Sequence, residues 1–209
     1  GNEVFQAYGL PVAPFRLALD AEQAIKAANA IGYPVVVKIA SADILHKTEA
    51  KGVKVGLANA EEVRQATAEV IANAKAYKAN AKIDGVLVQK MAPKGGTEVI
   101  FGAIKDATFQ QTVMFGLGGI FVEVLKDVTF RVAPVSPQEA RKMVTEIAAY
   151  PIIKGARGQK PRDEAALAQA LARLSQLVVD FPEIKELDAN PVMVYEDGLL
   201  IVDSVIKLQ

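Results

Sequence analysis

Apolar residues recur at helical spacing in four stretches of the chain, and each stretch opens with a start signal. Capping side chains precede the first three stretches at Asp20, Asn59 and Ser136. The first stretch stops at Gly32, and the fourth runs from about residue 163 to residue 179. The pattern therefore predicts four amphipathic helices, each with one buried face.

Short runs of apolar and β-branched residues lie between these helices, bounded by turn residues. Several of them follow one another directly, separated by turns rather than by helices. This order predicts a mixed sheet architecture of the α+β class, not a strict alternation of strand and helix. The predicted strands are residues 35–39, 53–57, 85–90, 98–105, 112–115, 129–133, 184–188, 192–195 and 199–205.

The last two predicted strands are joined by a strong hairpin signal, Asp197-Gly198. A turn there, with Gly198 at positive φ, places Asn190 opposite Asp203 or within one residue of it. Cross-strand neighbours share a face, so an amide oxygen and a carboxylate would form an all-oxygen clamp. Such clamps hold Mg²⁺ together with substrate phosphates and water. The alternative is that Asn190 closes a turn and Asp203 caps an edge strand.

The composition is that of a globular protein, with 51% hydrophobic and 23% charged residues in a chain of 209. Lys plus Arg number 24, as do Asp plus Glu, so no broad basic surface predicts a nucleic-acid partner. The absence of cysteine excludes disulfides and thiolate chemistry and fits a reducing, cytoplasmic compartment. No apolar run reaches the roughly 18 residues of a membrane span, so we expect no membrane partner.

The only histidine, His46, follows the first predicted strand and lies in a basic segment with Lys47, Lys51 and Lys54. Such a segment could hold phosphate oxygens, and an imidazole nitrogen could carry a phosphoryl group covalently. The alternative is a solvated charged loop. Lys38 follows three valines in a buried run and needs an anionic partner, either a nucleotide phosphate or a structural ion pair.

Two further segments could contact a nucleotide. The glycine-rich turn at residues 115–120 could bring backbone N–H groups close to an anion, although such turns are usually structural. Gln89, Lys90 and Met91 follow an apolar strand and could form a hinge that offers backbone groups to an adenine edge. Glu98 could bind ribose hydroxyls. Taken singly, each of these features is more often structural.

Taken together, these segments resemble the ATP-grasp domain of NDP-forming acyl-CoA synthetases. The type is the β subunit of acetate–CoA ligase (ADP-forming), which is related to succinyl-CoA synthetase. The resemblance covers nearly the whole chain, and the combination of motifs is specific. The motifs are YPVVVKI at 33–39, ILHKT at 44–48, GVKV at 52–55, MFGLGG at 114–119, VEVLKD at 122–127, FRVAP at 130–134 and ELDANP at 186–191.

The resemblance implies a single ATP-grasp domain over residues 1–209, in which two lobes of mixed sheet and helices clasp ATP or ADP. The lid lobe would span about residues 20–88, and the larger lobe would combine residues 1–19 and 89–209. It also implies which residues contact the nucleotide. Lys38 would contact the phosphates, Gln89, Lys90 and Met91 would surround the adenine, and Glu98 would bind the ribose.

The resemblance further implies phosphoryl-transfer chemistry. His46 would relay the phosphoryl group, and Asp188 would steady the phosphohistidine loop. Asn190 and Asp203 would bind Mg²⁺, in agreement with the hairpin argument. We also expect Arg131 to face the phosphate site.

The implied enzyme is a ligase that needs CoA-binding and ligase domains, either fused or on a partner subunit, because this chain has no recognisable CoA-binding domain. The opening of the chain reads as though cut into an element, which suggests a subunit or an excised domain. The alternative function is a regulatory domain of a protein lysine acetyltransferase. Where the family often has Gly-Gly-Val, this chain has Lys51, which should stiffen the loop or demand negative φ there.

Overall fold

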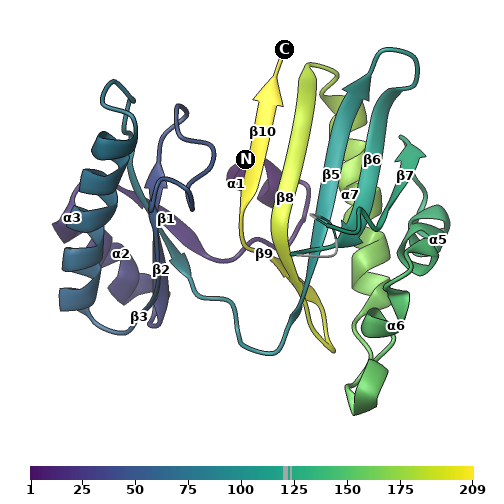
Figure 1. Ribbon diagram of the computed structural model, residues 1–209, viewed down its shortest axis with the longest axis horizontal. Helices are drawn as coiled ribbons and strands as arrows, with labels where there is room; N and C mark the ends of the chain where they lie inside the picture. The colour runs from purple at the N-terminus through teal and green to yellow at the C-terminus, as the bar shows by residue number, and fades with distance from the viewer. Residues whose placement is uncertain (120–121, 123) are drawn as a thin grey trace. The chain divides into compact units, whose positions relative to one another are not determined.

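The computed structural model describes residues 1–119, 122 and 124–209, and the backbone alone of Arg157 (Figure 1). Ile120 and Glu123, which belong to the glycine-rich turn and the VEVLKD motif, lie outside the described residues. The chain divides into two compact units. The smaller unit is residues 13–92, and the larger unit combines residues 1–12 with residues 93–209.

The smaller unit is a four-stranded antiparallel sheet with two helices on one face. The strand order is β1-β4-β2-β3. Alternate residues Val35, Val37 and Ile39 of the central strand β2 are buried in one cluster with Ala28 and Val70 of the two helices, which removes apolar surface from water. The elements are β1 (Phe15–Ala18), α2 (Ala21–Ile31), β2 (Val35–Ala40), β3 (Val53–Leu57), α3 (Ala60–Tyr77) and β4 (Gly85–Lys90).

The larger unit is built on a second antiparallel sheet, in the order β10-β8-β5-β6-β7, with β9 also paired to β8. Helices α5 and α7 lie along one side of this sheet (Figure 1). Leu167, Leu171 and Leu174 of α7 are fully buried there. The elements are α1 (Asn2–Ala7), β5 (Thr97–Asp106), β6 (Gln110–Leu117), β7 (Val128–Val132), α5 (Pro137–Glu146), α6 (Tyr150–Ile153), η1 (Ala156–Gly158), α7 (Glu164–Asp180), β8 (Ile184–Val194), β9 (Leu199–Ile201) and β10 (Ser204–Leu208).

The four predicted helices are confirmed as α2, α3, α5 and α7, and each begins at a side-chain cap. Asp20, Asn59, Ser136 and Asp163 each accept a hydrogen bond from the N–H three residues later, at 2.8, 3.0, 3.2 and 2.9 Å. These caps satisfy N–H groups that have no partner inside the helix. Gly32 ends α2 with φ of 85°, a conformation that glycine adopts without steric strain.

Three strand predictions near the C-terminus are wrong in their bounds. Residues 184–188 and 192–195 form the single strand β8, and residues 199–205 are divided between β9 and β10. The partner strand β5 shifts register between Val99 and Phe101, which face Val192 and Ala189, so β8 accommodates its extra residue as a bulge. The short elements β1, α1 and α6 were not predicted, and β1 belongs to the smaller unit although it precedes residue 20.

Candidate functional site

The C-terminal hairpin has the predicted turn and register. The N–H of Tyr195 donates to the carbonyl oxygen of Gly198 at 3.0 Å, and Gly198 has φ of 78°, so the turn is centred on the two residues between them. Further along the hairpin, the N–H of Asn190 donates to the carbonyl oxygen of Asp203 at 3.1 Å. Asn190 and Asp203 are therefore cross-strand neighbours.

Alternation along β8 sorts its side chains onto two faces of the sheet. Leu187 and Ala189 are buried on the helix-covered face. The side chains that alternate with Leu187 and Ala189 along β8 therefore point to the opposite face. Side chains from β10 and from the residue directly before it lie beside them on that face. Four oxygen-bearing side chains share this face, which we call the oxygen strip: Glu186, Asp188, Asn190 and Asp203.

Burial, together with electrostatic repulsion within the oxygen strip, changes the pKa of the central carboxyl of the strip, that of Asp188. Burial, followed by the negative charges of Glu186 and Asp203, raises the pKa of Asp188 to about 6, against an opposing effect of Lys207. Lys207 lies opposite Glu186 and donates a hydrogen bond to its Oε2 at 2.8 Å. One cation thus offsets only part of the negative charge that these carboxylates bring together.

The donor chemistry of the strip fits Mg²⁺, which prefers oxygen ligands and usually retains water and substrate phosphates in its shell. Asp203 supplies a carboxylate and Asn190 an amide oxygen from facing strand positions. Within the described part of the chain, no group of three or more His, Cys, Asp or Glu could hold a metal ion. A cation held by Asn190 and Asp203 would therefore need further ligands from outside these side chains.

Glu98 lies on the same face of the sheet as the oxygen strip and is exposed. It pairs with Met193 of β8, while its neighbour Val99 is buried on the other face. The glycine-rich segment passes directly beside it. The N–H of Gly118 donates to the carbonyl oxygen of Glu98 at 2.9 Å, and a Cβ on Gly118 would come within 3.1 Å of the Glu98 Cβ. A glycine therefore favours this close approach, because a Cβ here would force its neighbour to shift by a few tenths of an ångström.

Lys38 is buried in the smaller unit, with 4% of its surface exposed. It lies on β2 between Leu87 of β4 and Val53 of β3. Because Val37 and Ile39 point toward the helices, the Lys38 side chain extends from the helix-free face of the sheet. A buried ammonium on an interior strand is costly without an anionic or dipolar partner.

The predicted hinge occupies the end of β4. Gln89 is fully buried, its Nε2 lies 3.5 Å from the carbonyl oxygen of Ala13, and its Oε1 has no hydrogen-bond partner among the described residues. Lys90 directs its ammonium at backbone carbonyls at the end of α2. Met91, half-buried, follows the last residue of the strand. The unpaired amide oxygen of Gln89 is a group that a ligand donor could satisfy.

His46 is exposed in the loop between β2 and β3. The loop is anchored by buried Ile44 and Ala50, and the N–H of Ala50 donates to the His46 carbonyl oxygen at 3.2 Å. Lys51 has φ of 48°. Of the two expected alternatives, a stiffer loop or a negative φ, the negative φ is wrong, because the loop keeps a left-handed conformation that a lysine adopts only with strain.

The sequence pattern of the family described as ATP-grasp domain matches residues 1–208. This chain belongs to the ATP-grasp family. The domain is 49% identical over 203 residues to the β subunit of ADP-forming acetate–CoA ligase I of Pyrococcus furiosus, covering 97% of this chain and 87% of that subunit. It is 52% identical over 198 residues to the ADP-forming 4-hydroxybutyrate–CoA ligase of Nitrosopumilus maritimus, covering 95% of this chain but 28% of that protein.

A solved acetyl-coenzyme A synthetase 1 of Ca. Korarchaeum cryptofilum, in complex with coenzyme A and Ca-AMPCP, matches this ATP-grasp domain with a TM-score of 0.96 at 46% identity. The match covers 99% of this chain and 90% of that chain. Another solved form of that enzyme, with a TM-score of 0.84, carries Mg-AMPPCP, and its phosphohistidine segment points towards the nucleotide-binding site. The predicted family and the α+β ATP-grasp fold are confirmed.

The relatives are ligases, and the alternative of a regulatory acetyltransferase domain gains no support from them. The ATP-grasp domain spans most of the separate β subunit but about a quarter of the longer ligase. Within the described residues, no helix is both long enough and apolar enough to cross a membrane.

The predicted site residues of the ATP-grasp domain are divided between its two units. In the larger unit, all four share one face of the sheet. In the smaller unit, the hinge residues lie together at the end of β4, apart from the loop that carries the histidine. The smaller unit carries Lys38, His46, Gln89, Lys90 and Met91, and the larger carries Glu98, Asp188, Asn190 and Asp203.

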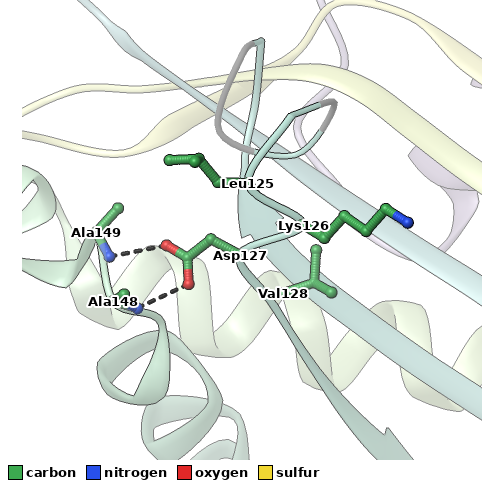
Figure 2. A pocket seen from close by; sticks show the side chains of 6 residues that line it. All are labelled: Leu125, Lys126, Asp127, Val128, Ala148 and Ala149. Carbon is green, nitrogen blue, oxygen red and sulfur yellow. Dashed lines mark hydrogen bonds between the residues drawn. The ribbon is translucent and has the colours of Figure 1, made fainter.

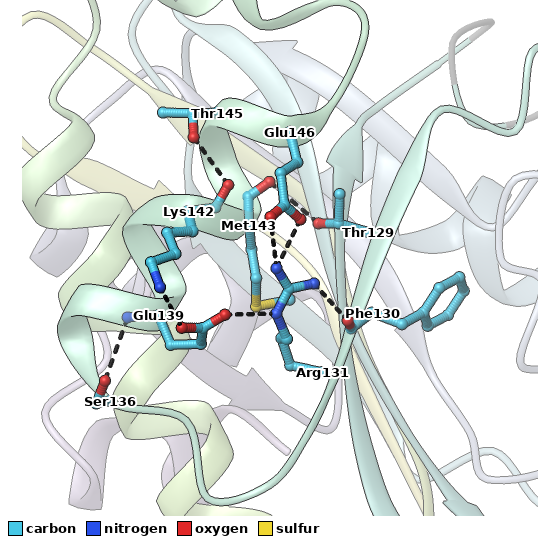
Figure 3. A network of polar contacts seen from close by, with 9 residues as sticks. All are labelled: Thr129, Phe130, Arg131, Ser136, Glu139, Lys142, Met143, Thr145 and Glu146. Carbon is cyan, nitrogen blue, oxygen red and sulfur yellow. Dashed lines mark hydrogen bonds and ion pairs between the residues drawn. The ribbon is translucent and has the colours of Figure 1, made fainter.

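The expectation that Arg131 faces the phosphate site is wrong. Arg131 pairs with Val113, which is buried on the helix-covered face, so its guanidinium points away from the oxygen strip. Figure 3 shows it bound to two carboxylates of α5. Its Nε donates to Glu139 at 2.8 Å, and its Nη2 donates to both oxygens of Glu146 at 2.6 and 2.7 Å. Arg131 therefore fastens β7 to α5.

A hollow of about 510 Å³ lies at the start of β7, but no predicted site residue lines it (Figure 2). Asp127 in its wall accepts hydrogen bonds from the N–H groups of Ala148 and Ala149, each at 2.8 Å. The carboxylate thus ties the start of β7 to the connection between α5 and α6.

Sequence reasoning missed two residues that influence the site, Glu186 and Lys207. Both act on the acidity of Asp188. Side chains two residues apart along a strand lie on the same face, so Glu186 lies on the face of Asp188 and Asn190. The sequence pattern could therefore have predicted Glu186. Lys207 could be found only by extending the hairpin register beyond Asp203.

Proposed function

We propose that this chain is the nucleotide-binding and phosphoryl-transfer domain of an ADP-forming acyl-CoA synthetase. The observation that carries the proposal is the oxygen strip, where Asn190 and Asp203 face each other beside Asp188. The kinship with ADP-forming acetate–CoA ligases supports the reaction class. The complete enzyme would make ATP from acyl-CoA, phosphate and ADP, or run in reverse, through acyl phosphate and phosphohistidine.

In this proposal, Asn190 and Asp203 hold Mg²⁺ with the nucleotide phosphates. Mg²⁺ bound there would spread the negative charge that develops on the transferred phosphoryl group. The raised pKa of Asp188, caused mainly by its burial, supports a cation nearby because a cation would relieve the repulsion within the strip. Asp188 steadies the loop that carries the phosphohistidine.

The remaining contacts orient the nucleotide. The ammonium of Lys38 binds phosphate oxygens, and its position on the helix-free face of the sheet supports this contact. Gln89, Lys90 and Met91 surround the adenine, and the unpaired Oε1 of Gln89 supports a ligand donor at that position. Glu98, exposed on the face of the oxygen strip, binds the ribose hydroxyls.

His46 relays the phosphoryl group. In the direction from ATP, a bond forms between an imidazole nitrogen and the γ-phosphorus while the bond from that phosphorus to the bridging oxygen breaks and ADP leaves. The exposed position of His46 in a loop supports a side chain that can reach a phosphoryl donor. The reverse step regenerates ATP from ADP.

The thioester chemistry belongs to CoA-binding and ligase domains of the same enzyme, either fused to this chain or on a partner subunit. The relatives support both arrangements, because one is a separate β subunit and another is a longer ligase. The lid at about residues 20–88 and the cytoplasmic location stay predictions.

The test is phosphoryl transfer to His46. We would incubate the chain and its partner domains with γ-labelled ATP and Mg²⁺ and follow label on this chain. Acid-labile, base-stable label that is lost in His46→Ala, and kept in the control Glu49→Ala from the same loop, is the expected result. Nucleotide binding without label on wild-type chain would contradict the transfer and point to a binding module.

A further inference from the structure

Lys90 is the last residue of β4, two residues before the chain leaves the smaller unit. Its ammonium does not point into open solvent. Nζ donates to the carbonyl oxygens of Gly32 and Tyr33, both at 2.8 Å. These carbonyls follow the last turn of α2, where backbone oxygens lack partners inside the helix and the helix dipole favours a cation. The lysine is therefore a cap for the end of α2.

Backbone hydrogen bonds hold Lys90 and Met91 on two further sides. The N–H of Lys90 donates to the carbonyl oxygen of Pro14 at 2.8 Å, and the N–H of Met91 donates to that of Pro34 at 3.2 Å. Pro14 lies just after the other point at which the chain passes between units. The hinge segment, residues 89–91, is thus fastened to residues 13–14 on one side and to residues 32–34 on the other.

We propose that Lys90 is a positioning residue for the base of the nucleotide, and the proposal rests on the function proposed above. Its ammonium touches protein carbonyls rather than phosphate and holds the hinge segment at the distance from α2 that presents Gln89 and Met91 to the purine ring. Two hydrogen bonds from one ammonium fix the segment because shifting it would leave both carbonyls without a donor. Lys38 acts at the phosphate end, and Lys90 acts at the base end.

The test is calorimetric titration of the 209-residue chain and its variants with three probes: Mg-ADP, adenosine and Mg-pyrophosphate. Lys90→Met should bind Mg-ADP and adenosine roughly tenfold more weakly, equivalent to one lost hydrogen bond, and Mg-pyrophosphate unchanged. Lys90→Arg, which can still donate to both carbonyls, should restore adenosine affinity. Lys26→Met, which removes an exposed lysine from α2, should leave all three affinities unchanged.

Retained pyrophosphate binding also shows that the variant is folded. If Lys90→Met does not fold, Lys90→Gln replaces it and should show the same selective loss for adenosine. If Lys90→Met loses affinity equally for pyrophosphate and adenosine, or loses none for adenosine, the positioning role is overturned. The proposed function still stands in that case, provided that the wild-type chain binds Mg-ADP. Failure of the wild-type chain to bind Mg-ADP removes the proposed function and this inference with it.

Discussion

Lys90 of the smaller unit and the oxygen strip of the larger unit hold their charges in opposite ways. In the smaller unit, the ammonium of Lys90 lies 2.8 Å from two backbone carbonyl oxygens, so its charge is matched by fixed dipoles. In the larger unit, carboxylates gather on one sheet face, and burial together with Glu186 and Asp203 raises the pKa of Asp188 to about 6. The end of β4 is therefore held in place by protein groups alone, whereas the oxygen strip keeps a repulsion that a bound cation would relieve.

The largest effect is expected when a proposed metal ligand is removed from the oxygen strip. Asp203→Ala should weaken Mg²⁺-dependent nucleotide binding by at least about 100-fold, because the clamp loses its carboxylate. Titration calorimetry with Mg-ADP measures the loss, and circular dichroism should show an intact fold. The matched control is Asp197→Ala, which removes an exposed carboxylate from the turn of the same hairpin. Unchanged affinity in Asp203→Ala would contradict the clamp.

The corresponding change in the smaller unit is Lys38→Ala. This substitution should weaken the binding of ATP by about 2 kcal/mol more than the binding of adenosine. That difference is the size of a lost hydrogen bond to a charged group. Competition binding of ATP and adenosine to the variant and to wild type gives the difference directly. Lys75→Ala, on the exposed side of α3, serves as the control for loss of a positive charge. Equal losses for both ligands would show that Lys38 does not act on phosphate.

The free-energy cost of ionising Asp188 can be measured as the dependence of stability on pH. The pKa of Asp188 is raised in the folded state, mainly by burial, to about 6, so its contribution to stability is present below its unfolded pKa and is lost as pH rises through about 6. Without Mg²⁺, Asp188→Asn should therefore be more stable than wild type by roughly 1 to 2 kcal/mol at about pH 8, and about equal at about pH 4.

Urea unfolding with a chelator present measures this difference at each pH. Asp197→Asn in the exposed turn should stay within about 0.5 kcal/mol of wild type at both pH values. If Asp188→Asn is less stable than wild type at the higher pH, the ionised Asp188 is stabilised by its surroundings. That result would contradict the claim that the oxygen strip disfavours the ionised carboxylate.

The smallest expected effect concerns the loop that carries His46. Lys51 has φ of 48°, so Lys51→Gly should stabilise the chain by about 1 kcal/mol by removing left-handed strain. Glu49→Gly in the same loop has no positive φ to relieve and should lower stability slightly. Thermal unfolding of both variants provides the measurement. A loss of stability in Lys51→Gly would show that its side chain contributes more than its backbone strain costs.

Local signals in the sequence predicted much of this molecule. The caps at Asp20 and Ser136 and the turn before Gly198 depend on residues within a few positions of one another, and the structure confirms them. The facing positions of Asn190 and Asp203 follow from that turn by counting along two strands. The family resemblance needed the whole order of motifs, because no single motif is specific.

Predictions failed where the outcome depended on distant partners. Asn190 and Pro191 look like a turn in sequence, yet β8 runs through them because β5 shifts its register opposite them. The face on which Arg131 lies is set by its pairing with Val113 and by the carboxylates of α5, neither of which its own motif reveals. The left-handed φ of Lys51 is likewise imposed by the loop around it.

The most direct measurement is a crystal structure of this chain with ADP and Mn²⁺, in which anomalous scattering locates the metal. The expected result is a metal ion about 2.1 Å from an oxygen of Asp203 and from the amide oxygen of Asn190, with phosphate oxygens completing its shell. A metal ion bound elsewhere, or these two side chains turned away from the nucleotide, would contradict the oxygen strip as the metal site.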